Sequence, residues 1–388
     1  FGVQRLRLSV EESRRIVADV RSRVRSHNAG RRMVEERVFG LLAERSRQPI
    51  APEDLRDRIR RMEEVRYALE WMWPVLSASE LLNDLYSSRA LIASAAAGRL
   101  SDDEIDLLLS PRHDDASKRI WAFADAPVLD EAFVRLGARP GRRDSDVIRT
   151  YGHILVDEAQ DLSPMELRTL RRRSLNGSMT VVGDIAQATS PWAHDDWDEV
   201  LEALPQRRPA RRVELRTGYR LPGPIMELAA QLLPLAAPGL APPSSIRELG
   251  DEPVVERVDD FSGSSRFADV LVGAVRREVN AVGQGSVAVV CADAWLERCE
   301  RALTDAGVDF GRATRHGLDE QVTVVVVRMV KGLELDSVIV VEPADILEAD
   351  DRGPQALYVA LTRATRRLSL VHERPLPEVL LGSGGKRS

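Results

Sequence analysis

The feature that most constrains the fold is an alternation of short, apolar, β-branched runs with helical stretches, which begins near residue 118. This alternation is typical of parallel sheets, because parallel strands are joined by crossover helices rather than by tight hairpins. It predicts an α/β fold for this part of the chain, with a Pro/Gly-rich connector at 234–245. The expected strands are 153–156, 180–182, 212–215, 254–258, 286–291, 322–327, 337–341 and 368–371.

The first 110 residues carry signals for helices rather than for strands. Capping boxes of the form Ser-x-x-Glu stand at 9–12, 77–80 and 101–104, before apolar runs with helical spacing. Residues 52–72 repeat apolar side chains at near-heptad intervals, which predicts one long helix with a single apolar seam. The seam residues are Leu55, Ile59, Met62, Leu69 and Met72. We therefore expect a helical arm in front of the α/β part.

Charge is distributed unevenly along the 388 residues. The net charge is −6, so contact with nucleic acid would need a local basic patch. Residues 1–70 hold 17 arginines against 12 acidic residues, a net charge of +5, which leaves −11 for the remainder. Two interpretations stay open for this basic arm: an interaction surface for protein or nucleic acid, or an ordinary solvated helix face.

Cysteine content and hydropathy bear on the compartment. The two cysteines, Cys291 and Cys299, are expected to be reduced thiols of a cytoplasmic protein. No apolar run approaches the ~18 residues of a membrane span, so we expect no membrane partner. The chain opens on Phe1 without a signal peptide, which leads us to expect that it starts inside a longer protein. The tail at 382–388 is expected to be disordered.

The strongest chemical signal is the segment 154–161, which reads Ile-Leu-Val-Asp-Glu-Ala-Gln-Asp. An apolar strand here ends in two carboxylates, at the end of a strand where open α/β sheets bind ligands. Asp157 is placed to hold Mg²⁺, directly or through water, and Glu158 to orient or deprotonate an attacking water. A bare Asp-Glu pair is also common at helix N-termini; the strand and the rest of the segment favour the catalytic interpretation.

This segment resembles motif II (Walker B) of the UvrD/Rep-type superfamily 1 helicases. The next strand leads into residues 182–187, Val-Gly-Asp-Ile-Ala-Gln, which resemble motif III. The resemblance implies that Gln187 couples the γ-phosphate to the nucleic-acid groove and that Asp184 belongs to the nucleotide site. It also places Trp192 at a position that often stacks on bases, and packing in the core or on the surface is the rival interpretation.

Residues 215–220, Leu-Arg-Thr-Gly-Tyr-Arg, resemble motif IV of the same family, with Gly218 in place of the usual Asn. The resemblance implies that Arg220 contacts the γ-phosphate and that Tyr219 packs against the nucleotide base. An arginine suits this role because its planar fork of donors matches phosphate oxygens.

Two more segments complete the series. Residues 330–336 resemble motif V, in which Gly332 would let the backbone approach a phosphate and Glu334 would bind the nucleotide sugar. Residues 357–364 resemble motif VI, in which Arg363 would be the second arginine finger. Five motifs in the family's order imply ATP and Mg²⁺ as cofactors.

A phosphate-binding loop of the form Gly-x-x-x-x-Gly-Lys-Ser/Thr does not occur in the sequence. The family carries this loop upstream of motif II. The chain is therefore expected to be the carboxyl-terminal portion of a longer protein or a degenerate homologue. In either case we expect it to be inactive as an ATPase by itself.

Spacing and the helical front point to one branch of the family. Only 111 residues separate Arg220 from Lys331, which leaves no room for the 2B subdomain of processive UvrD-like helicases. Segments 71–77, 80–82 and 121–132 resemble HelD (also HelR), bacterial UvrD-like NTPases that bind RNA polymerase. This resemblance implies a helical insertion in the first RecA-like domain that acts on the polymerase.

The resulting prediction is an α/β protein with two RecA-like parallel-sheet domains preceded by a helical arm. The expected limits are 1–115 for the helical insertion, 116–214 and 215–380 for the two RecA-like domains, and 381–388 for the tail. We expect a monomeric, ATP-driven factor that binds RNA polymerase, displaces nucleic acid and recycles the polymerase. A superfamily 1A DNA helicase or translocase in repair and a non-catalytic polymerase-binding module are the alternatives.

Overall fold

The computed structural model describes residues 5–140, 148–204, 208–258, 264–312 and 320–381. The chain divides into two compact units, Phe1–Tyr151 and Gly152–Ser388, and each is described by itself. The expected disordered tail at 382–388 lies outside the described residues. The domain limits expected from the sequence stay predictions.

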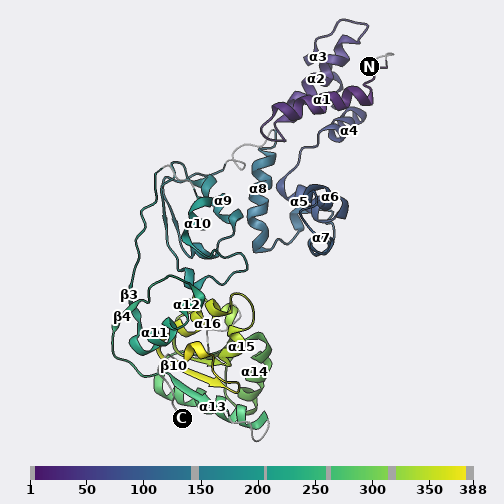
Figure 1. Ribbon diagram of the computed structural model, residues 1–388. Helices are drawn as coiled ribbons and strands as arrows, with labels where there is room; N and C mark the ends of the chain where they lie inside the picture. The colour runs from purple at the N-terminus through teal and green to yellow at the C-terminus, as the bar shows by residue number, and fades with distance from the viewer. Residues whose placement is uncertain (1–4, 141–147, 205–207, 259–263, 313–319, 382–388) are drawn as a thin grey trace. The chain divides into compact units, whose positions relative to one another are not determined.

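The described part of the first unit is helical, and it contains no strand, as expected (Figure 1). The three predicted capping boxes are present at the starts of α1, α5 and α7. The elements of this unit are α1 (Val10–Arg23), α2 (Gly30–Glu44), α3 (Pro52–Ile59), α4 (Glu63–Met72), α5 (Ala78–Tyr86), α6 (Arg89–Ala96), α7 (Asp102–Leu108), η1 (Ala116–Lys118), η2 (Phe123–Asp125) and α8 (Ala126–Leu136).

The prediction of one long helix over 52–72 is wrong, because the segment forms α3 and α4 with a break between them. Met62, an expected seam residue, is the extended residue before α4 and its side chain is 44% exposed. Leu55 and Leu69 are buried in the same apolar cluster. In a straight helix these two residues would lie about 21 Å apart along the axis, so the break lets both ends of the segment reach one core.

The second unit is built around a parallel sheet that has six strands within the described residues, in the order β5-β10-β9-β6-β8-β7. Its strands are β5 (Val254–Arg257), β6 (Val287–Cys291), β7 (Gly311–Arg312), β8 (Val322–Val326), β9 (Leu335–Val341) and β10 (Ala364–His372). The helices around it are α11 (Gly223–Ala230), α12 (Leu233–Ala236), α13 (Ser264–Val282), α14 (Leu296–Asp305), α15 (Pro343–Leu347) and α16 (Gly353–Thr362).

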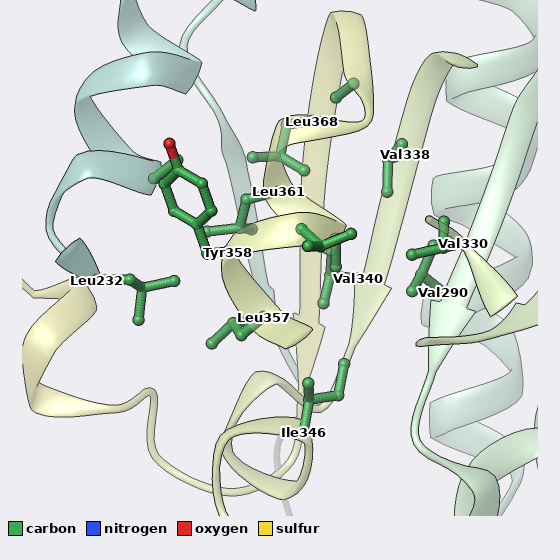
Figure 2. Packing of buried hydrophobic residues seen from close by; sticks show 14 of the residues in the cluster. Leu232, Val290, Val330, Val338, Val340, Ile346, Leu357, Tyr358, Leu361 and Leu368 are labelled. Atoms are coloured by element: carbon green, nitrogen blue, oxygen red, sulfur yellow. The ribbon is translucent and has the colours of Figure 1, made fainter. Parts of the chain in front are cut away.

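Both faces of this sheet are covered. Along β6, Val287 and Val289 join a cluster with side chains of α13 and α14, whereas Ala288 and Val290 join a cluster with side chains of α11, α12 and α16. Figure 2 shows the second cluster, with Leu357 of α16 among its labelled side chains. A strand that is buried on both faces must be apolar throughout, which explains the continuous valine runs in the sequence. The predicted α/β class is confirmed, and this sheet is consistent with the RecA-like fold.

Two shorter parallel pairs complete the second unit. Strands β1 (Ile154–Val156) and β2 (Met179–Val181) pair, and β1 packs through Val156 against Leu167 of α9 (Pro164–Arg173) and Val200 of α10 (Trp197–Ala203). Leu155, on the opposite side of β1, is 69% exposed. Strands β3 (Thr217–Pro222) and β4 (Ser244–Arg247) form the other pair.

The predicted strand at 212–215 is wrong, since this segment is not a strand and β3 begins after it, at Thr217. Val213 and Leu215 are 65% and 88% exposed, so these apolar residues do not pack into a core. The strand forms instead where Thr217 can pair with Ser244 of β4. The expected connector at 234–245 is correspondingly shorter in the structure, because its first residues belong to α12 and its last residues to β4.

A buried carboxylate fixes α13 to the main sheet. Glu278 of α13 has no exposed surface and accepts hydrogen bonds from Ser337 Oγ (3.0 Å), Ser369 Oγ (2.9 Å) and Arg367 Nε (2.7 Å). Burial by itself would raise the pKa of Glu278, but the hydrogen bonds from Arg367 and the two serines outweigh it and hold this pKa below its usual value. Glu278 is therefore a charged group inside the fold, satisfied from both β9 and β10.

Two further observations concern expectations about the compartment. Cys291 and Cys299 are both buried and free, so the predicted thiol state is present. In the part of the chain that the structure describes, none of the helices combines the length and apolar composition needed to cross a membrane.

Candidate functional site

The candidate site begins at the carboxyl end of β1, where Asp157 and Glu158 follow Val156. The carboxylate of Asp157 accepts a hydrogen bond from the backbone N–H of Glu158 (2.9 Å). Glu158 has a φ of +51°, a left-handed conformation that is uncommon for a residue with a Cβ. Both side chains are exposed. Backbone strain of this kind is concentrated at functional sites.

Gln160, two residues further on, fixes the orientation of Glu158. Its side chain is fully buried, and its Nε2 donates to Glu158 Oε2 (2.6 Å). Its Oε1 accepts from the backbone N–H of Asp184 (3.1 Å), which follows β2. A Cβ at Gly183 would lie 2.1 Å from Gln160 Oε1, so the absence of a side chain at Gly183 is what admits this contact. One amide thus connects the ends of β1 and β2.

Asp184 fixes Gln187 in turn. Its carboxylate accepts from the backbone N–H of Ala186 (3.0 Å) and caps the short 3-10 helix η4 (Ile185–Gln187). The same carboxylate accepts from Nε2 of Gln187 (2.7 Å). The amide of Gln187 is therefore oriented with its oxygen directed away from Asp184, available to a donor.

Arg363 supplies that donor from the end of α16. Its Nη2 donates to Gln187 Oε1 (2.9 Å) and its Nε donates to the carbonyl oxygen of Val359 (3.3 Å). The residue is 6% exposed. Within the described residues, Nη1 of Arg363 has no acceptor. A guanidinium that is held at two positions and has a free donor is prearranged to bind an anion.

The charges around Arg363 show which groups converge on it. Burial lowers the pKa of Arg363 most, and the nearby Arg220 guanidinium lowers it further. The carboxylates of Glu158, Glu334 and Asp184 act in the opposite direction on this pKa. These groups come from motifs II to VI, and the fold therefore brings them within electrostatic reach of one another.

Arg220 and Glu334 form an ion pair at the edge of the same region. Arg220 Nη2 lies 2.9 Å from Glu334 Oε1, with side-chain exposures of 40% and 57%. Tyr219, next to Arg220 on β3, is 73% exposed. Gly332 has a φ of +80°, and a Cβ added to it would meet open space. Its backbone is therefore accessible, which is the condition for close approach of a ligand.

Lys331 lies beside the catalytic candidates, and it is one of only three lysines in the chain. Its Nζ forms an ion pair with Asp161 Oδ2, donates to the carbonyl oxygen of Gln187 (2.7 Å) and lies 3.4 Å from Glu158 Oε2. The side chain is 19% exposed. A single ammonium is thus shared between two carboxylates of motif II and the backbone of motif III.

Trp192 is connected to the same centre through Asp161. Its indole Nε1 donates to the carbonyl oxygen of Asp161 (3.0 Å), and the residue is 47% exposed. The Asp161 carboxylate accepts from the backbone N–H groups of Thr189 (3.0 Å) and Ser190 (3.1 Å). Trp192 is not a core residue, and stacking on bases stays a prediction for it.

The structure brings most of the expected site residues together and adds three. Hydrogen bonds, an ion pair or charge interactions connect six of them, with Asp157 adjacent to Glu158 and Tyr219 adjacent to Arg220. The six are Glu158, Asp184, Gln187, Arg220, Glu334 and Arg363. Sequence reasoning assigned no role to Gln160, Asp161 or Lys331. The signals available for them were a lysine in a chain that otherwise uses arginine, and two polar residues that follow the paired acids after one alanine.

The oxygen donors at the site can be set against the ligands that Mg²⁺ requires. Among the described residues there is no group of three or more His, Cys, Asp or Glu side chains that could hold a metal ion alone. Mg²⁺ is usually held by one or two carboxylates together with water and the phosphates of a bound nucleotide. The exposed Asp157 carboxylate fits that arrangement, in which the nucleotide supplies the remaining oxygens.

Comparison with protein families gives one match. Residues 296–372, which include Lys331, Gly332, Glu334 and Arg363, match the model of the viral superfamily 1 RNA helicase core domain. The match supports a helicase-like protein of superfamily 1. It covers less than half of the chain, and no curated protein matches the sequence.

Solved structures give weaker likenesses. The chain is similar to the C-terminal domain of a possible DNA helicase from Lactobacillus plantarum WCFS1, with 24% identity over 42% of this chain and 92% of that one, and a TM-score of 0.33. It is similar to the Sulfolobus solfataricus SWI2/SNF2 ATPase core in complex with dsDNA (13% identity, 33% and 31% covered, TM-score 0.25). It is also similar to the Arterivirus nonstructural protein 10 helicase in complex with DNA, with 20% identity over 31% of this chain and 29% of that one, and a TM-score of 0.22. None of these TM-scores reaches 0.5, so no functional statement rests on them.

Proposed function

We propose that this chain contributes the water-activating and phosphate-sensing residues of a superfamily 1 nucleic-acid motor that hydrolyses ATP. The observation that carries the proposal is the hydrogen bond between Arg363 Nη2 and Gln187 Oε1 (2.9 Å). It joins an anion-binding group to an amide that is held, through Asp184 and Gln160, to the carboxylate of Glu158. Phosphoryl transfer needs a residue that orients the nucleophile and cations that stabilise the charge on the phosphate, and these hydrogen bonds connect one candidate of each kind.

Each group then has a defined task. Glu158 accepts a proton from, or orients, the attacking water, since its carboxylate is exposed and its direction is set by Gln160. Arg363 and Arg220 donate to phosphate oxygens as negative charge develops. Asp157 would hold Mg²⁺, which when bound neutralises phosphate charge. A phosphate loop is absent from the sequence, so hydrolysis requires that loop from another segment.

The proposal about the partner is more specific than the assignment to superfamily 1. We propose that the motor acts on RNA polymerase, in the manner of HelD-like factors, to displace nucleic acid and recycle the enzyme. Two observations support this: the 111-residue interval between Arg220 and Lys331 leaves no room for a 2B subdomain, and the described part of the first unit is helical. Translocation on single-stranded DNA in repair, and polymerase binding without hydrolysis, are the competing functions.

The test is steady-state ATP hydrolysis by the full-length protein, measured alone, with single-stranded DNA and with core RNA polymerase. Arg363→Ala should lower the turnover number by about 10³-fold while the protein stays folded, the usual scale for an arginine finger. Arg366→Ala is the matched control, because Arg366 is three residues away, half exposed and paired with Asp336 at 3.7 Å. A loss of less than about tenfold for Arg363→Ala would refute its role.

The same assay separates the competing functions. Stimulation by DNA without any binding of polymerase would favour the repair translocase over the polymerase factor. Polymerase release that is unchanged in Glu158→Gln would show that binding, and not hydrolysis, is the operative step.

A further inference from the structure

The positive charge of residues 1–70 is concentrated on one helix of the first unit. On α2 and α3 the arginines are engaged with carboxylates, as in the pairs Arg32–Glu36 (2.8 Å) and Arg56–Glu35 (3.3 Å). Within the described part of this segment, a smaller set of arginine side chains has neither an ion pair nor a hydrogen bond. The set is Arg5, Arg7, Arg14, Arg15, Arg21, Arg25, Arg61 and Arg66. All but the last two lie in α1 or within a few residues of its ends.

Helix α1 presents three of these arginines to solvent. Ile16 and Val20 are buried in the apolar core of the unit and fix which side of the helix faces inward. Arg14, Arg15 and Arg21 are exposed. Because Arg14 and Arg21 are seven residues apart, they project from the same side of the helix, about 10.5 Å from each other along its axis. We call Arg14, Arg15 and Arg21 the α1 arginine row.

The acidic residues of α1 do not neutralise this row. Glu12 and Asp19 form ion pairs with arginines outside it, namely Arg45, Arg23 and Arg37. Glu11 is the remaining acidic residue of the helix, and it forms no ion pair with any of the three arginines. The row therefore keeps most of its positive charge, which is available to an anionic partner.

The dipole of α1 does not account for the row. A basic residue in the last turn, such as Arg21, is favourable beside the carbonyl groups at the end of the helix. Arg14 and Arg15 lie in the half of the helix toward its N-terminus, where the dipole gives a cation no stabilisation. Two of the three charges thus have no role in the stability of their own helix.

We propose that the α1 arginine row binds the phosphate backbone of duplex nucleic acid, as a contact separate from the candidate hydrolytic site. The planar fork of a guanidinium suits phosphate oxygens. A duplex encloses its bases and carries its phosphates on the outside, so a row of cations alone is enough to bind it.

The composition of α1 favours a duplex over the two other anionic partners. Proteins that bind single strands add aromatic side chains on which bases stack, and α1 contains no aromatic residue. Interfaces with proteins centre on aromatic and other apolar anchors. The large apolar side chain that α1 exposes is Val10, at its first residue. A duplex needs neither kind of group.

The experiment measures the affinity of the full-length protein for a short fluorescein-labelled DNA duplex by fluorescence anisotropy over a series of salt concentrations. The triple variant Arg14→Gln/Arg15→Gln/Arg21→Gln should bind about 10–100-fold more weakly near physiological salt. The slope of log K against log salt concentration should become less steep by about 2–3, because each phosphate contact contributes about 0.9 to it. ATP hydrolysis measured without nucleic acid should stay at the wild-type rate, since none of the three residues belongs to the candidate site.

The matched control removes the same charge from the same unit. Arg32, Arg89 and Arg112 are exposed by 81%, 48% and 60%, and each already pairs with a carboxylate. Their triple replacement by glutamine should keep the wild-type affinity and slope. Equal weakening of duplex binding in the two triple variants would show an effect of overall charge and would overturn the proposal.

Two parallel measurements test the choice of partner. Binding of single-stranded oligo(dT) should be unchanged in the α1 variant, and a loss as large as that for the duplex would overturn the assignment to duplexes. Unchanged duplex binding together with weaker binding of core RNA polymerase would identify the row as a protein contact instead. Circular dichroism spectra that match the wild type check that both variants are folded. Each of these failures leaves the proposed hydrolytic function in place.

Discussion

Replacement of Glu278 by glutamine tests whether the buried carboxylate holds α13 to the main sheet. The carboxylate accepts hydrogen bonds from Arg367, Ser337 and Ser369, and it has no exposed surface. Glutamine keeps the shape, but its NH₂ group replaces one acceptor and faces an arginine N–H in either orientation, that of Arg277 at the Oε1 position or that of Arg367 at the Oε2 position. Loss of one charge-assisted bond and a mismatched donor should cost about 2–4 kcal/mol.

The assay is hydrogen exchange of the backbone amides of β9 and β10 in the full-length protein, which reports the free energy of local opening without assuming that the two units unfold together. Asp251→Asn is the matched control: Asp251 pairs with the same Arg367 but its side chain is 64% exposed, so its loss should cost less than about 1 kcal/mol. Equal protection of β9 and β10 in the two variants would refute the reasoning.

The same network predicts a dependence on pH. Because the pKa of Glu278 is lower in the folded state than the usual value of about 4.3, the unfolded chain takes up a proton here before the folded protein does. The stabilisation is therefore fully present above that usual value, and it is lost as the pH falls through the folded-state pKa. Glu278→Gln should remove this part of the acid dependence, which an acid titration of the same exchange rates would show.

Three further outcomes are expected. Gly183→Ala should lower the rate of ATP hydrolysis by about 10–100-fold, because the new Cβ would lie 2.1 Å from Gln160 Oε1 and displace the amide that orients Glu158. Gly152→Ala is the control: its Cβ meets nothing within 4 Å, so the rate should stay unchanged. Ser77→Ala should destabilise α5 by about 1 kcal/mol through loss of its capping box, measurable as faster amide exchange in α5 only. Cys291 and Cys299 should resist iodoacetamide in the native protein and react after denaturation, because both are buried. The pKa of the Cys299 thiol is also raised, chiefly by its neighbour Cys291 and by burial. Rapid labelling of the native protein would contradict the burial of these thiols.

What the sequence could predict about the fold depends on how local the cause is. A capping box involves residues three apart, and all three predicted boxes are present. Runs of β-branched residues likewise predicted most strands to within a few residues, because the apolar run itself reflects burial on both faces. The run at 212–215 misled because an apolar segment can also be exposed, and the pairing with β4 that places β3 could not be seen locally.

The same distinction applies to the candidate site. Glu158 was nominated by its place at the end of a strand, where α/β folds bind ligands, whereas Gln187 and Arg363 were nominated by the resemblance of their segments to superfamily 1 helicase motifs. Which of them touch was decided by the tertiary structure: Arg363 meets Gln187 across 176 residues of chain, and Lys331 meets Asp161 across 170. Contacts of that length depend on how sheets and helices pack, and no local pattern of residues encodes them. The sequence therefore predicted a kind of chemistry and nominated most of the candidate residues, whereas the fold decided that one lysine, Lys331, lies between the carboxylates of Glu158 and Asp161.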